Sequence, residues 1–173
     1  MKTTIALFAT AAMLNLGTPA LAADGPTDPQ IAHIAYTAGN IDIAAAKQAL
    51  AKTHNKTIRS FAQEMMRDHQ AVNAKALALV KKLHVTPQGN PTSQSLAKGG
   101  RDELAKLKHL HGAKFDRAYI DNEVAYHKTV NGALESTLIP NAKNGELKSL
   151  LETGLTLFKE HQAHAEHVAK ELK

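Results

Sequence analysis

Four long stretches of this 173-residue chain carry apolar residues at every third or fourth position, and this spacing constrains the fold most. The stretches cover about residues 29–53, 56–83, 114–139 and 146–172. The clearest series, in the second stretch, is Ile58, Phe61, Ala62, Met65, His69, Val72, Ala76, Val80 and Leu83. Residues at this spacing share one face of an α-helix. Because Ala, Leu, Lys and Glu are also frequent and favour helix, we expect an all-α protein.

The connections between these helices predict how they are arranged. A break near residue 54 joins the first pair, and the Asn144–Gly145 turn joins the second pair. Short connections usually give antiparallel neighbours, whereas the roughly 30 residues between the two pairs are unusually many. That connection contains a loop at 85–91 and a shorter helix that Thr92 or Ser93 would cap. We therefore predict a ferritin-like four-helix bundle, whose one long crossover carries a short helix.

The first 22 residues have the features of a secretory signal peptide. Lys2 supplies a positive start, and the segment from Ile5 to Leu16 is almost wholly apolar. Ala20 and Ala22 are small residues at the positions that a signal peptidase reads. We predict a signal peptide at 1–22, one domain at 23–173 and a periplasmic location, with outer-membrane association as an alternative. No second apolar run is long enough for a transmembrane segment.

The charge of the chain after residue 22 is mildly positive. Of 21 Lys and Arg, only Lys2 lies in the leader, which leaves 20 against 16 Asp and Glu, or +4 with His neutral. The Lys residues are scattered and aromatic residues are few, so we expect no nucleic-acid partner. A surface of this charge would attract anionic envelope lipid or polymer only weakly. The chain contains no Cys, so it must be stabilised by packing or by a metal.

Five ionisable residues occupy positions where the helices should present apolar side chains: Asp42, His69, Glu123, His127 and His161. Each lies within about one turn of the midpoint of its helix, and helix midpoints superpose in a bundle whatever the helix directions. The five side chains should therefore meet at one level of the core. Buried charges and imidazoles cost several kcal/mol unless they are paired or bind a metal.

Imidazole and carboxylate ligands together suit a transition metal such as Zn, Fe, Mn or Cu. The favoured hypothesis is one ion bound by His69, His127 and His161, with Asp42 or Glu123 as the carboxylate ligand. Asp68, at the edge of the apolar face, would accept a hydrogen bond from one of these ligands. The alternative is a metal-free polar network that fixes the register of the helices. The motifs of serine hydrolases, P-loop proteins and dinucleotide-binding proteins are absent from the sequence.

Several segments resemble a bacterial exported family of unknown function, numbered four thousand one hundred and forty-two. The segment from Phe61 to His69, read FAQEMMRDH, and the segment from Phe115 to Ile120, read FDRAYI, match its second and third helices. Leu157 to His161 matches the last helix, and Ala38 to Asp42 the first, where relatives more often carry Glu. The resemblance covers about residues 31–170.

The resemblance implies a ferritin-like bundle, and members of the family are labelled outer-membrane or exported proteins. It supports Asp42, Asp68, His69, His127 and His161, whereas Glu123 rests on its helix face alone. The di-iron pattern of ferritin-like proteins needs Glu-x-x-His on two helices, and this chain lacks it. From the five ionisable residues on the apolar faces we expect metal binding or handling under envelope stress. A metal-free interaction module is the first alternative, and a metal-dependent oxidoreductase is the second.

Overall fold

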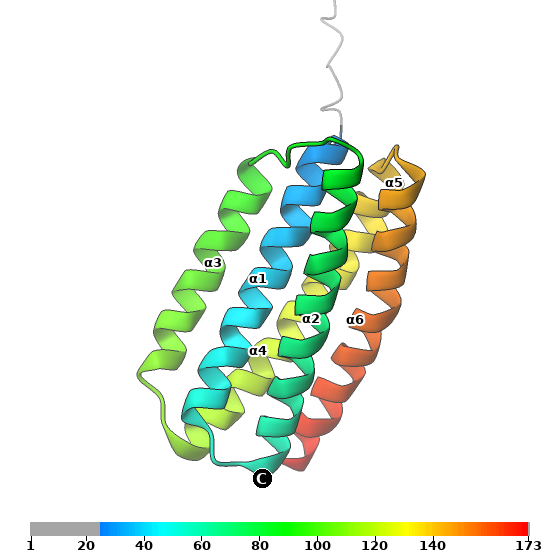
Figure 1. The fold of residues 1–173 in the computed structure, drawn as a ribbon. Coiled ribbons are helices and arrows are strands. Elements are labelled where there is room, and N and C mark those ends of the chain that lie inside the picture. Colours follow the sequence, from blue (N-terminus) through cyan, green and yellow to red (C-terminus); the bar gives the residue numbers. More distant parts are fainter. Residues whose placement is uncertain (1–24, 173) are drawn as a thin grey trace, which may run out of the picture.

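The computed structural model describes residues 25–172, which form an all-α helical bundle (Figure 1). The predicted leader at 1–22 lies outside the described residues. The helices are α1 (Asp28–Lys52), α2 (Lys56–Lys82), α3 (Pro91–Lys108), α4 (Gly112–Ala133), the π-helical turn η1 (Leu134–Leu138), α5 (Ile139–Asn141) and α6 (Gly145–Glu171). The predicted fold class is confirmed. No helix within these residues has both the length and the apolar composition needed to cross a bilayer.

Four long helices surround the core, and α3 lies outside them along α1. The pairs α1 with α2 and α4 with α6 are antiparallel, as their short connections predict (Figure 1). The crossover through α3 returns the chain to the other end, so that α2 and α4 run in the same direction (Figure 1). Gly100 permits the close packing of α3 on α1, because a Cβ atom there would lie 2.8 Å from Cγ1 of Ile41. α3 continues through both Gly99 and Gly100 without interruption.

Asparagine side chains begin three of the helices. Asn55 Oδ1 accepts hydrogen bonds from the Thr57 and Ile58 amides at the start of α2, and Asn144 caps α6 in the same way. Asn90 caps α3, with its Oδ1 accepting from the Ser93 amide at 3.0 Å. The prediction of Thr92 or Ser93 as this cap was therefore wrong. Pro91 occupies the first turn, where its missing N–H costs nothing, so the helix begins before the predicted residues.

The third long helix extends as far as the sequence predicted, but its hydrogen-bonding pattern changes near its end. Its α-helical part ends at Ala133, and the Ile139 amide donates to the Leu134 carbonyl five residues back. Pro140 explains the wider turn, because proline has no N–H and its ring crowds the carbonyl four residues before it. The π-helical turn relieves this crowding and lets the helix continue to Asn141. Such turns often lie at functional sites.

The core differs between the two ends of the bundle. Toward the end of α1, it is filled by large side chains: Phe61, Met65, Phe115, Tyr119 and Ile120. Toward the start of α1, the core contains aliphatic residues, including Ile31, Leu134 and Leu151. The polar residues of the candidate site lie between these two clusters, so the site separates a half that contains several fully buried aromatic rings from a mainly aliphatic half.

Asp28 connects the start of α1 to the turn before α6 through hydrogen bonds. Its two carboxylate oxygens accept hydrogen bonds from the amides of Lys143 and Asn144, each at 2.8 Å. Hydrogen bonds to a charged acceptor are stronger than neutral ones. We expect Asp28→Ala to lower the free energy of unfolding by about 1–3 kcal/mol, measured by urea denaturation. Asp102→Ala removes an exposed ion pair with Lys98, which water screens, and should change the free energy of unfolding far less; equal losses would contradict this role for Asp28.

Candidate metal centre

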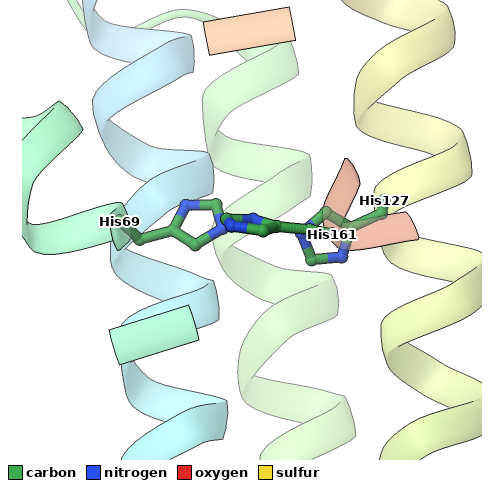
Figure 2. Close-up of side chains that lie close together, drawn as sticks. All are labelled: His69, His127 and His161. Carbon is green, nitrogen blue, oxygen red and sulfur yellow. The ribbon is translucent and has the colours of Figure 1, made fainter. Parts of the chain in front are cut away.

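Three histidines from three helices meet in the middle of the bundle (Figure 2). His69 comes from α2, His127 from α4 and His161 from α6. Their ring centroids are 5.3 to 5.6 Å apart, and each residue is at most 3% exposed. One nitrogen from each ring lies within 4.8 Å of the corresponding nitrogens of the other two. The structure thus brings together all three histidines that the sequence singled out.

In two of these histidines, one ring nitrogen makes a hydrogen bond and the other has no hydrogen-bond partner. The Nδ1 atom of His127 lies 3.0 Å from the Glu123 carbonyl, and the Nε2 atom of His161 lies 3.2 Å from Oδ2 of Asp68. Since a carbonyl and a carboxylate only accept, each of these nitrogens carries the proton. The opposite nitrogens, Nε2 of His127 and Nδ1 of His161, are buried without a hydrogen-bond partner. Metal-binding histidines are oriented in this way.

His69 is the least satisfied member of the cluster. Both of its ring nitrogens are buried and make no hydrogen bond. Its ring stacks on Phe158 of α6, with centroids 4.7 Å apart and planes inclined by 11°. Phe158 therefore fixes the plane of the ring while leaving the nitrogens without partners. The apolar spacing of α6 placed Phe158 in the core, but it gave no indication of this stacking.

Burial keeps the three imidazoles neutral. It lowers the pKa of His127 from 6.5 to about 4, although the bond to the Glu123 carbonyl opposes the shift. It also lowers the pKa of His161, against the effect of Asp68, and places the pKa of His69 well below its usual value. The neutral form has a lone pair to donate, so the cluster is in the protonation state that metal ligation requires.

Two carboxyl groups lie beside the histidines. Oδ2 of Asp42 is 3.3 Å from Nε2 of His69 and 3.6 Å from Nε2 of His127. Oε2 of Glu123 is 3.6 Å from Nδ1 of His127. Burial raises the pKa of Asp42 to about 7, and burial followed by the charge of Asp42 raises the pKa of Glu123 well above its usual value. Asp42 approaches two of the three rings, whereas Glu123 approaches only that of His127, so Asp42 is the better placed of the two carboxyl groups to share an ion with the histidines.

Asp68 lies at the boundary between the site and solvent. It accepts hydrogen bonds from Arg67 and lies within bonding distance of His161, and Arg67 is the main cause of its lowered pKa. Asp68 thus lies beside one histidine of the cluster, and this histidine is His161 on α6 and not the neighbouring His69. Glu64 pairs with His164 at 2.8 Å. With Asp68 and His161 it forms a second, partly exposed group of side chains.

Polar contacts that the sequence did not indicate support the level of Asp42. The Tyr126 hydroxyl donates to the Ala38 carbonyl at 2.9 Å, which joins α4 to α1. Asn73 of α2 donates to Asn40 at 3.1 Å. Gly39 makes room for this amide, because a Cβ atom there would lie 2.4 Å from Oδ1 of Asn73. These contacts hold α1 close to both neighbours, and so they position Asp42 against the histidines.

A family model described as "Domain of unknown function (DUF4142)" matches residues 15–168, which include every residue of the candidate site. Comparison with curated proteins and with solved structures gives no match. Because the model matches most of the chain, this protein belongs to the DUF4142 family.

Proposed function

We propose that this protein is exported to the periplasm and binds one transition-metal ion at the middle of a ferritin-like bundle. His69, His127 and His161 would be the ligands, and Asp42 would be the carboxylate ligand. The observation that carries the proposal is the set of buried ring nitrogens without partners on three rings close enough together to share one ion. Leaving buried polar atoms unsatisfied costs about 1–3 kcal/mol each, and a metal would remove this cost.

The residues present fit a metal of the Zn, Fe, Mn or Cu group. Three neutral imidazoles and one carboxylate make four ligands of the kind that these ions accept. The set contains too few carboxylates for the di-iron pattern, so a single ion fits better. Asp68 and the Glu123 carbonyl would hold the outer nitrogens of two ligands and keep their rings in position. The proposed role is metal binding or handling in the envelope.

Metal binding is tested by titrating the chelator-treated protein with each of the four metals and measuring the bound ion by elemental analysis. We expect one ion per chain, and we expect His161→Ala to weaken the dissociation constant by more than about 100-fold. His167→Ala is the matched control on α6, because His167 is exposed and pairs only with Glu171. Equal binding by the two variants, or less than one ion per wild-type chain, would contradict the proposal.

A second variant separates loss of a ligand from loss of the fold. Asp68→Asn keeps all four proposed ligands, and its side chain is partly exposed. Removal of the acceptor that orients a ligand usually weakens metal affinity by about 10- to 100-fold. We expect Asp68→Asn to show this intermediate loss with an unchanged circular dichroism spectrum. A metal-free polar network, the alternative function, predicts no specific metal binding in any of the variants.

A further inference from the structure

A cavity of about 690 Å³ lies directly beside the candidate metal centre. It occupies the mainly aliphatic half of the bundle, between α1, α2, α4 and α6. Small residues on three helices create the space: Ala35 and Ala38 on α1, Ala76 on α2 and Gly154 on α6. A side chain on Gly154 would enter this space, because a Cβ atom there meets only Phe158, at 3.5 Å.

The walls of the cavity are mostly apolar, and the buried polar atoms of Asp42 and His69 lie at the end beside the histidine cluster. Among the lining residues that the structure describes there is no Lys, Arg or Glu, and they include Ile34, Leu134 and Leu151. Asn73 and Asn90 also line the cavity, but their side chains donate hydrogen bonds within the protein. Asp42 and His69 differ, because both oxygens of Asp42 and both nitrogens of His69 are buried without hydrogen-bond partners. Most of these unsatisfied atoms are hydrogen-bond acceptors.

The cavity is long, and its rim reaches the surface. Its lining on α6 extends from Leu147 to Phe158, which is about 16 Å along the helix axis. Thr129, Ala133 and Thr137 on the α4–η1 segment also line it and are exposed to solvent. A linear molecule could enter at this rim and extend between the four helices toward Asp42.

We propose that this cavity binds a linear alkyl molecule whose single polar end donates a hydrogen bond to Asp42 or His69. The apolar walls match the alkyl chain, and the acceptors at the end of the cavity match a donor such as a hydroxyl group. A carboxylate end would find no cationic side chain among the lining residues. The proposal does not require a bound metal, because the alkyl chain would contact residues outside the histidine cluster, but a metal held by Asp42 and His69 would compete with the polar end for the same atoms.

The first test measures the dissociation constants of linear alcohols from hexanol to dodecanol by isothermal titration calorimetry. The protein is treated with chelator and measured again after zinc is added, so that failure of this proposal is distinguished from failure of metal binding. Each added methylene should tighten the dissociation constant by about fourfold until the chain fills the cavity. An affinity that does not change with chain length would overturn the proposal.

The second test fills the cavity from one wall. Ala76→Leu places a larger side chain in the existing space, and Ala78→Leu on the same helix is the matched control because Ala78 is exposed and does not line the cavity. We expect Ala76→Leu to weaken decanol binding by at least about tenfold, since several methylenes lose their place. Both variants should keep the wild-type circular dichroism spectrum. Equal decanol affinity for the two variants would overturn the proposed site.

The third test addresses the polar end of the ligand. The methyl ether of decanol has the same alkyl chain but cannot donate a hydrogen bond. We expect it to bind at least about fivefold more weakly than decanol, because the buried acceptors stay unsatisfied. If the ether binds as tightly as the alcohol, the assignment of Asp42 and His69 to the polar end is wrong. If decanoate binds more tightly than decanol, the ligand is an anion and the proposed hydrogen-bond-donating end is wrong.

Discussion

In the metal-free protein, the Asp42→Asn variant is expected to be more stable than the wild type near neutral pH, by up to about 4 kcal/mol. Asp42 is almost completely buried and its oxygens have no hydrogen-bond partner. Burial raises its pKa from 3.8 to about 7, so above that pH the folded wild type holds an ionised carboxylate in its core. Asparagine has nearly the same shape and never ionises.

The sign of the pH dependence follows from the raised pKa. Between pH 3.8 and about 7 the folded state binds the Asp42 proton more tightly than the unfolded state does. The stability that this proton contributes is fully present below pH 3.8 and is lost as the pH rises through about 7. The advantage of Asp42→Asn should therefore be small near pH 4 and largest above about pH 7.

Urea denaturation of both proteins across this pH range, with chelator present, measures the effect. The histidines are common to both proteins, so their own titration largely cancels in the difference. Asp121→Asn is a matched control, because Asp121 is exposed and pairs with Arg117 at the surface of α4. A stability difference between wild type and Asp42→Asn that is constant across the pH range would contradict this account. Adding Glu123→Gln should extend the effect, because the pKa of Glu123 is raised as well.

Replacing Phe61 by Ala is expected to lower the free energy of unfolding by about 3–5 kcal/mol. Phe61 has no exposed surface and lies in the half of the core that large side chains fill. Its ring packs edge to face against Tyr119 of α4 and His164 of α6, with centroids 6.2 and 5.2 Å apart. The truncation would leave a cavity between three helices and remove both aromatic contacts.

The same helix offers a control for the Phe61 variant. Leu77 is 47% exposed, and its truncation to Ala should change the free energy of unfolding by less than about 0.5 kcal/mol. Equilibrium urea denaturation, monitored by circular dichroism because the chain has no Trp, measures both variants. Similar losses for Phe61→Ala and Leu77→Ala would contradict the expected contribution of the buried Phe61 ring to stability.

The fold and the level of the site were accessible from the sequence because both depend on helical spacing. His69 belongs to the apolar face of α2, and His127 and His161 hold the same position on α4 and α6, so all three were expected to meet. Asp42 was expected at the same level, because it lies within about one turn of the midpoint of its helix. These inferences need only the 3.6-residue period and approximate helix ends, which a single sequence supplies.

Contacts between helices were not accessible in the same way. Residue spacing gives the face and the level of a side chain, but it does not give the side chain of another helix that it contacts. Asp68 is next to His69 in the sequence, yet its partner in the structure is His161. The stacking of His69 on Phe158 likewise depends on the rotation of α6 relative to α2. The cavity depends on small residues from separate helices, each of which looks like an ordinary helical alanine or glycine in the sequence.

The distribution of the site over the helices has a consequence for the order in which it can assemble. Asp42, His69, His127 and His161 come from four different helices, and the last of them is on α6, which follows the other three along the chain. A nascent chain that has emerged only as far as α4 would lack His161 and the acceptor contact that it makes with Asp68. Occupancy of the centre would therefore require all four helices to be present, and a bound ion would act as a non-covalent cross-link closing loops of many residues.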